Sequence, residues 1–379
     1  MNGLHAARAL LVLLISVLVL VASSSALGST CVTQRAPDQP RQVKWHPGHY
    51  ITLPSGQGND PSFMRDALSE LERHPALRGI QKRYSWAQLE PVKDRYDFSG
   101  IEKDLELLAA RGKQLVVLLQ LKTFSNEHEI VPAYLKSETY DGGTFELEVR
   151  ADGNFRKNAR AGSGLKLWHP AVRERVVALA CAMGRQLNAQ PHLEAVAITE
   201  TAIGQPRVTL TREQVDRYFD SLVAVHRAWR VAFPNTVTLQ FVNYPRSHIE
   251  AFTKAITAFG AGVGGPDTFL ADRGLEAGAY KLYPPLAGVV PLAPSVQPEN
   301  YAARQHRGPR NPPSPEELYD FARTRLSANY IFWTRRLVGS EQPWFDVLKF
   351  IQSPAFPRDP AGGLAERSEE HTSELQSLT

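Results

Sequence analysis

A short apolar run that ends in a carboxylate constrains this chain more than any other feature. Residues 193–198 read Leu-Glu-Ala-Val-Ala-Ile, and Thr199 and Glu200 follow at once. A run of this length with β-branched residues predicts a buried strand. Helix-patterned segments flank it on both sides, so we interpret it as one strand of a repeating strand–helix unit. In a closed barrel of such units, the carboxyl ends of the strands build the active site.

The same alternation continues along most of the chain. Residues 45–366 hold eight strand candidates separated by helical segments, which predicts an α/β fold, a (β/α)8 TIM barrel, with a long insertion after strand three at residues 122–166. A doubly wound open sheet is the alternative, but no Gly-rich phosphate loop follows the first strand. The strand candidates are residues 48–53, 77–86, 114–121, 193–201, 236–243, 263–267, 288–297 and 328–333.

Helical periodicity fills the intervals between these strands. Ser314, Pro315 and Glu317 have the spacing of a capping box at the start of one helix. Within the insertion, the alternating residues 144–149 are expected to form one arm of a hairpin. The helices are expected at residues 61–73, 99–111, 168–187, 212–233, 248–259, 315–326 and 343–351.

The first residues have the pattern of a targeting segment. Arg8, the apolar run 9–22 and the small residues 24–26 predict a secretory signal peptide over residues 1–26. The apolar run is shorter than the about 20 residues of a membrane span. We therefore expect no stable membrane insertion after cleavage and a secreted or periplasmic protein; a retained anchor is the alternative. Residues 27–44 are polar and Pro-rich, which predicts a flexible lead.

The last residues are excluded from the fold. Arg367 to Ser377 resembles the translation of a common sequencing adapter, and residues 367–379 are therefore interpreted as an artefact. The barrel domain is then expected to span residues 45–366.

The composition of the chain limits the kinds of binding partner that we expect. The net charge of +4 is spread along the chain without a Lys/Arg block, so we expect no nucleic-acid partner. The two cysteines, Cys31 and Cys181, lack metal-ligand spacing, and we expect neither a metal nor a cofactor. Cys181 lies among apolar helical residues, where a buried free thiol is expected. We expect a monomer.

Three short motifs carry a family resemblance. Trp86, Leu89-Glu90-Pro91 and Tyr96-Asp97-Phe98, followed by a helix and the strand at Leu115, resemble the second strand–helix unit of retaining glycoside hydrolases, notably β-galactosidase-like barrels. This resemblance covers most of residues 45–350 in topology and only these short motifs in sequence. Glu90 itself is expected to clamp its own loop.

Two strand ends extend the resemblance. Glu200 resembles the acid/base residue that ends strand four, although Thr199 stands where the family has Asn. Trp333 resembles the aromatic residue that ends strand eight and forms the floor of the sugar site. The family nucleophile is a Glu that ends strand seven. Here either Glu299 is the nucleophile, displaced by two residues, or Gln297 occupies that position, where an amide cannot act as one.

Glycoside hydrolysis requires two carboxyl groups, one that donates a proton and one that stays ionised. We expect Glu200 to be the acid/base residue, with Glu299 and Asp267 as alternatives for the second role. Other side chains at predicted strand ends are candidates to bind the sugar, with barrel packing or loop structure as the alternative for each. They are Trp333, Trp86, Asn243, Tyr244, Arg83, Tyr50, Gln120 and Gln297.

The sequence therefore predicts an exported glycoside hydrolase that acts on a poly- or oligosaccharide. The alternative is a carbohydrate-binding barrel that has lost catalysis, because Gln297 and Thr199 depart from the family pattern. A non-sugar hydrolase on the same fold is a third reading, since fold does not fix chemistry.

Overall fold

A computed structural model describes residues 43–54, 60–124, 129–149, 160–301, 312–335 and 343–366. All of them belong to one compact unit, residues 40–379. The signal peptide expected at residues 1–26, nearly all of the expected lead and the adapter-like tail at 367–379 lie outside the described residues.

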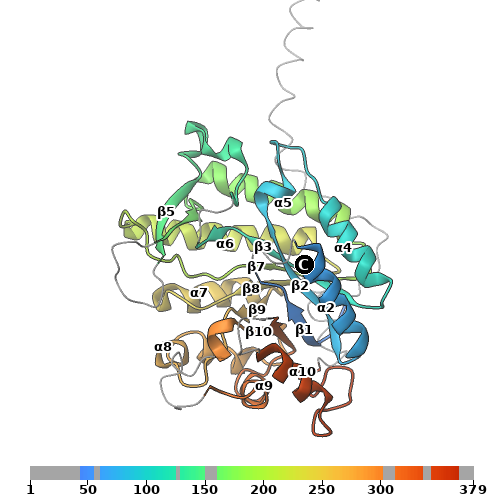
Figure 1. Cartoon of the computed structure of the whole chain (residues 1–379). Helices are drawn as coiled ribbons and strands as arrows, with labels where there is room; N and C mark the ends of the chain where they lie inside the picture. Colours follow the sequence, from blue (N-terminus) through green and yellow to red (C-terminus); the bar gives the residue numbers. More distant parts are fainter. Residues whose placement is uncertain are drawn as a thin grey trace, which may run out of the picture. The chain divides into compact units, whose positions relative to one another are not determined.

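The strands close into a barrel of eight parallel strands, in the order β1-β11-β10-β9-β8-β7-β3-β2 (Figure 1). The predicted TIM barrel is confirmed, and each expected strand is present. The barrel strands are β1 (Gly48–Thr52), β2 (Leu77–Ser85), β3 (Gln114–Gln120), β7 (Leu193–Ile198), β8 (Val237–Phe241), β9 (Gly262–Gly265), β10 (Leu292–Val296) and β11 (Tyr330–Thr334).

Helices cover the outside of the barrel. Those predicted from periodicity begin within two residues of their expected starts, and the Ser314–Glu317 capping box of α9 is present. Within the described residues, no helix is long and apolar enough to cross a membrane. The helices are α2 (Pro61–Arg73), α3 (Trp86–Leu89), α4 (Ser99–Ala109), α5 (Pro170–Leu187), α6 (Arg212–Ala232), α7 (Arg246–Thr257), α8 (Arg273–Glu276), α9 (Pro315–Thr324) and α10 (Pro343–Gln352).

Cys181 on α5 corrects one expectation. It is disulfide-bonded, so the free thiol expected from its apolar neighbours is wrong. Apolar neighbours bury a cysteine whether or not its sulfur is bonded, so they cannot distinguish a thiol from a disulfide.

The insertion after β3 builds a small antiparallel sheet in the order β4 (Lys122–Thr123), β6 (Arg160–Leu165) and β5 (Thr144–Val149). The hairpin arm expected at residues 144–149 is confirmed as β5. The backbone of β5 also bonds to the loop that follows β7. Glu148 N donates to Gln205 O at 2.8 Å, and Arg207 N donates to Glu146 O at 3.0 Å. The insertion is thereby joined to the segment that carries Glu200.

Side chains alternate between two apolar layers, as the pleat of each strand requires. The interior of the barrel is filled by residues such as Tyr50, Leu118 and Phe332, and the larger layer lies between strands and helices. Gly79 lets β2 and β3 approach closely, because a Cβ atom there would lie 1.9 Å from Gln114 O.

A buried carboxylate ties the closing seam of the barrel to two helices. The seam is the parallel pairing of β1 with β11, from Gly48–Tyr330 to Thr52–Thr334. Arg335 follows β11 directly, and its Nε and Nη2 donate to Glu70 of α2 at 2.7 and 2.9 Å. Trp344 Nε1 of α10 donates to the same carboxylate at 2.9 Å.

We expect Glu70→Gln to lower the free energy of unfolding by roughly 3–5 kcal/mol, because it removes the buried anion of the Arg335 guanidinium and leaves only the exposed Asp66 at 3.9 Å. Urea unfolding followed by circular dichroism measures the change. Glu72→Gln on the same helix is the matched control, since Glu72 is 53% exposed in its pair with Arg111 and such surface pairs contribute about 0–1 kcal/mol. Equal losses in the two variants would contradict a special role for the Glu70 cluster.

Candidate functional site

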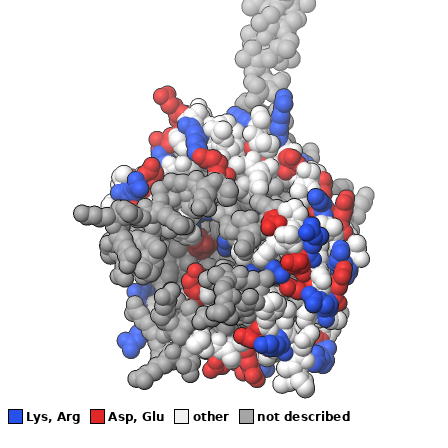
Figure 2. Space-filling view, viewed as in Figure 1, with Lys and Arg blue, Asp and Glu red and all other residues white. Residues whose placement is uncertain are grey.

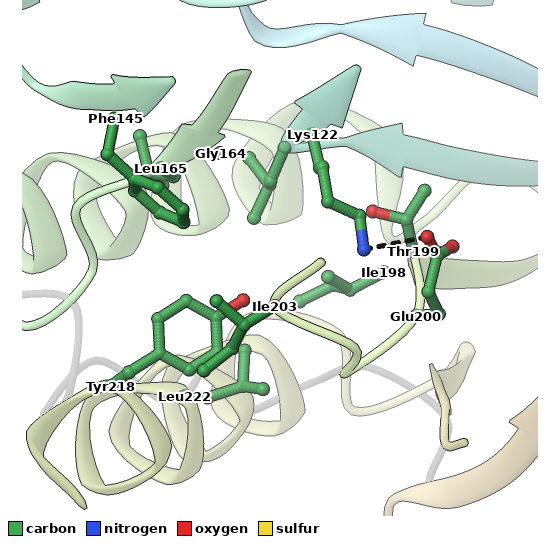
Figure 3. A pocket seen from close by; sticks show the side chains of 11 residues that line it. Lys122, Phe145, Gly164, Leu165, Ile198, Thr199, Glu200, Ile203, Tyr218 and Leu222 are labelled. Carbon is green, nitrogen blue, oxygen red and sulfur yellow. Dashed lines mark ion pairs between the residues drawn. The ribbon is translucent and has the colours of Figure 1, made fainter. Parts of the chain in front are cut away.

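Glu200 lies two residues beyond the carboxyl end of β7, on the face of the barrel where all strands end. The neighbouring backbone is held between two strands, with Thr199 N donating to Leu119 O and Thr201 N to Phe241 O. The Glu200 side chain is 14% exposed, and its Oε1 lies 2.7 Å from Lys122 Nζ (Figure 3). Lys122 comes from β4, so the insertion supplies the cation.

The surroundings of Glu200 favour an ionised carboxylate. Burial alone would raise its pKa, but the Lys122 ammonium, aided by the Arg83 guanidinium, holds the pKa below its ordinary value of 4.5. A proton donor at neutral pH needs the opposite shift. The surroundings therefore favour a charged Glu200 at neutral pH, and the acid/base role expected from the sequence stays a prediction.

The environment of Asp267 shifts its pKa in the opposite direction to that of Glu200. It lies two residues after β9, and burial raises its pKa to about 7, with the nearby carboxylates Glu200 and Glu299 adding to the increase. Asn300 Nδ2 donates to Asp267 Oδ1 at 3.3 Å, which opposes the increase without cancelling it. Asp267 therefore retains its proton up to near-neutral pH.

Asn300 organises this side of the mouth, and sequence reasoning did not predict it. It lies on the 3-10 turn η7 (Pro298–Tyr301) and is fully buried. Its Oδ1 accepts from Thr268 N at 3.1 Å and from Gln297 N at 2.6 Å. Asn300 thus fixes the segments after β9 and β10 together. No sequence motif marks it, because its role depends on contacts between distant segments.

Gln297 and Glu299, the two candidates for the nucleophile position after the seventh predicted strand, both follow β10. Gln297 follows β10 directly, and its Oε1 accepts from Thr334 Oγ1 at 3.5 Å. Glu299 lies on η7 with an exposed side chain, and its charge acts on Arg83 and Asp267. An amide therefore stands at the strand end, and the carboxylate is displaced to the rim.

Arg83 lies on the inner face of β2. Its neighbours Lys82 and Tyr84 face outward, where both donate to Asp104 of α4 at 2.6 and 2.5 Å. Burial lowers the pKa of Arg83, and the charges of Glu200 and Glu299 oppose that shift. Gln120, the last residue of β3, lies on the inner face with Leu118, two residues earlier.

Three predicted sugar-binding aromatic residues do not reach the mouth. Trp333 is fully buried on the outer face of β11, where its Nε1 donates to His49 Nδ1 at 2.9 Å. Trp86 is also fully buried, and its Nε1 donates to Glu90 Oε2 at 2.8 Å. Tyr50 fills the barrel interior and donates to His46 O, which precedes β1. A sugar cannot stack on a ring without an open face.

Glu90 has the loop-clamping role expected for it. Its carboxylate also accepts from Asp94 N at 2.9 Å and pairs with Arg175. The motif around Trp86 and Glu90 therefore stabilises the segment after β2 and contributes no catalytic group.

Asn243 and Tyr244, which follow β8, differ in burial and in their contacts. Asn243 is buried, and its Oδ1 accepts from Ala202 N at 3.0 Å and from Tyr244 N at 2.8 Å. It therefore orients the loop that carries Glu200. Tyr244 is 36% exposed.

A pocket beside Glu200 has largely apolar walls (Figure 3). Sequence reasoning did not assign a role to Tyr218 of α6, whose pKa is raised by burial and by Glu200. It also missed Phe124, an exposed ring whose centroid lies 5.1 Å from Lys122 Nζ. The lining residues are Leu121, Lys122, Phe145, Gly164, Leu165, Ile198, Thr199, Glu200, Ile203, Tyr218 and Leu222.

Outside this pocket, the surface carries charged side chains of both signs. Basic and acidic side chains are interspersed over the face shown in Figure 2. Among the described residues, no group of three or more His, Cys, Asp or Glu side chains could hold a metal ion.

Comparison with known proteins shows that this chain shares its barrel fold with solved structures of glycoside hydrolases. No protein-family model matches this chain, and a comparison with curated proteins finds no match. The catalytic domain of β-amylase from Paenibacillus polymyxa is similar with a TM-score of 0.51 and 8% identity, over 77% of this chain and 92% of that one. β-Galactosidase from Bacillus circulans sp. alkalophilus gives a TM-score of 0.53 and 12% identity, over 89% and 56%. At these identities the likeness shows a shared glycosidase-like barrel fold.

Replacing Lys122 tests the origin of the lowered pKa of Glu200. In Lys122→Met burial is no longer opposed by the ammonium, so the pKa of Glu200 rises. We expect a cost of roughly 3–5 kcal/mol in unfolding free energy at pH 7. That cost falls as the pH drops through the raised pKa of Glu200 in the variant, where the carboxyl takes up a proton, and is smallest below the lowered pKa of Glu200 in the wild type. Urea unfolding from pH 3 to 8 measures it, with the exposed Lys136→Met as control. A cost that does not vary with pH would contradict the assigned ion pair.

The raised pKa of Asp267 leads us to expect a folding stability that decreases as the pH rises, which is opposite in sign to the effect of Glu200. Its pKa is raised in the folded state, so its contribution to stability is complete below the ordinary 3.8 and is lost as the pH rises through about 7. Relative to Asp267→Asn, the wild type should lose on the order of 1–4 kcal/mol between these limits. Thermal melting across this pH range tests the expectation, with Asp346→Asn on the surface of α10 as control. A constant difference between wild type and Asp267→Asn would refute the shift.

Proposed function

We propose that this protein is an exported glycoside hydrolase that cleaves a poly- or oligosaccharide with two carboxyl groups. The observation that carries the proposal is the contrast between Glu200 and Asp267. The pKa of one carboxyl is lowered and that of the other is raised to about 7, at the mouth of a glycosidase-like barrel. A pair of carboxyls with divergent pKa values is the arrangement that supplies one acid and one charged group at the same pH.

In the proposed reaction, Asp267 donates its proton to the glycosidic oxygen as the bond from that oxygen to the anomeric carbon breaks. Glu200, held ionised by Lys122, stabilises the positive charge that develops on the sugar. It then either bonds to the anomeric carbon, from which water later displaces it, or removes a proton from an attacking water. Water finally supplies a hydroxyl to the sugar and a proton to the carboxyl pair. The separation of the two carboxyls in the substrate complex decides between these routes.

The other groups of the mouth fit this division of roles. Asn243 and Asn300 position the segments of Glu200 and Asp267, respectively. The exposed rings of Tyr244 and Phe124 are the described aromatic groups offered to the sugar.

Export rests on two observations. The first residues have the pattern of a secretory signal, and Cys181 is disulfide-bonded. Disulfides persist in oxidising compartments such as the periplasm and the extracellular space.

A carbohydrate-binding barrel without catalysis is the second candidate. It is favoured by Gln297, an amide at the end of β10, and by the direct ion pair of Glu200 with Lys122, which a catalytic carboxylate would have to loosen. In this function the mouth binds a glycan and leaves it intact.

Activity screens decide between the two candidates. With aryl-glycosides and polysaccharides as substrates, Glu200→Gln and Asp267→Asn should each lower kcat by about 10²- to 10⁴-fold, with the exposed Glu213→Gln as control. Wild-type activity should fall as the pH rises through about 7, because Asp267 then loses its proton. Full activity in both variants would reject the assigned roles. Glycan binding by the wild type without turnover would instead select the second candidate.

A further inference from the structure

Several buried hydrogen-bond donors inside the mouth have no partner among the residues that the structure describes. Arg83 Nε and Gln81 Nε2 lie on β2, Ser295 Oγ lies on β10, and Gln297 Nε2 follows it. In the barrel order, only β1 and β11 separate β2 from β10. These groups therefore occupy one side of the mouth. An unpaired buried donor costs free energy, and several on one side of a binding face need an explanation.

The strand pleat directs these side chains inward. Thr52 Oγ1 donates to Gln81 Oε1 at 3.0 Å across the inner face, which leaves the Gln81 amide nitrogen unused. Ala293 belongs to the apolar cluster inside the barrel, so Ser295 and Gln297 follow on the same face. Three of the four unpaired groups are nitrogen donors, and they require acceptors.

The guanidinium of Arg83 forms no direct ion pair with a described residue, although the charges of Glu200 and Glu299 act on it from farther away. Two other arginines with buried or half-buried guanidinium groups pair with carboxylates, Arg335 with Glu70 and Arg175 with Glu90. In the described part of the chain, no carboxylate lies within ion-pair distance of Arg83. The charge of Glu200 is bound by Lys122 at 2.7 Å. Glu299 is exposed, so solvent weakens the effect of its charge on Arg83 without removing it.

An arginine cannot relieve this situation by losing its proton, since its pKa stays above about 12 in proteins. Its planar fork matches the oxygen atoms of a carboxylate or sulfate, which accept two parallel hydrogen bonds. Arg83 is half-buried, so a ligand in the mouth can reach it.

We propose that the saccharide bound in this mouth carries an anionic group, a carboxylate or a sulfate ester, and that Arg83 recognises it. The unpaired amide of Gln297 contributes a further donor on the same side. This inference rests on the proposed function for the presence of a saccharide, and it adds the substrate class: acidic and not neutral glycans. Arg83 then acts on specificity, whereas Glu200 and Asp267 act on the bond that is cleaved.

Binding measured by calorimetry tests the inference without requiring turnover. The probes are oligogalacturonides and oligoglucuronides, the same oligosaccharides with their carboxyl groups reduced to alcohols, and sulfated galactan oligosaccharides. The proteins are the wild type, Arg83→Gln, Arg83→Lys and Arg65→Gln, an exposed control on α2. Melting temperatures identify any variant that fails to fold, and Arg83→Lys retains the charge if Arg83→Gln does not fold.

We expect the wild type to bind at least one acidic series about 10- to 100-fold more tightly than its neutral counterpart. Arg83→Gln should abolish this preference, Arg83→Lys should retain part of it and Arg65→Gln all of it. The series that responds identifies the anion as carboxylate or sulfate. Equal binding of neutral and acidic probes, or a preference that survives in Arg83→Gln, would overturn the inference and leave the proposed function intact. Failure to bind any saccharide would overturn both.

Discussion

Closure of the barrel between β1 and β11 is the constraint on which the rest of the structure depends. Because every strand of the barrel is parallel to its neighbours, closure brings all eight carboxyl ends to one rim. Residues from β2, β7, β9 and β10 then share one mouth although they are far apart in sequence. The buried carboxylate of Glu70 supports this seam from outside by holding Arg335 and α10. The electrostatics of the mouth depend on that arrangement, since charges from other segments contribute to the pKa shifts of Arg83, Glu200 and Asp267.

Within the mouth, the insertion after β3 changes the pKa of Glu200, a residue that lies outside the insertion. Its first strand holds Lys122 against Glu200, and β5 is bonded to the loop beyond Glu200. The ammonium lowers the pKa of a carboxylate that burial alone would raise. In the part of the chain that the structure describes, no cation forms an ion pair with Asp267, and burial, opposed only in part by the Asn300 amide, raises its pKa to about 7. The two carboxyls of one mouth thus differ in pKa because, among the described residues, Glu200 has a basic partner in ion-pair contact and Asp267 has none.

The fold could be predicted from the sequence because its signals are local. Apolar runs, capping residues such as Ser314 and the alternation of residues 144–149 each report on a few neighbours along the chain. The side of the sheet on which a side chain lies is harder to predict, since a shift of one residue along the strand reverses it. Trp333 shows this: Phe332 points into the barrel, so the ring beside it points out. The partners of Glu200 and Asp267 could not be predicted, because Lys122 and Asn300 meet them only after distant segments pack together.

The central claim is that Glu200 is ionised while Asp267 still keeps its proton as the pH approaches 7 from below. Carbon-13 NMR of selectively labelled carboxyl groups, followed in one sample from pH 3 to 9, measures both at once. The account predicts that the Glu200 signal changes below its ordinary pKa of 4.5 and that the Asp267 signal changes near 7. If both carboxyls titrate together near 4, the mouth holds no proton donor at neutral pH, and the account is contradicted.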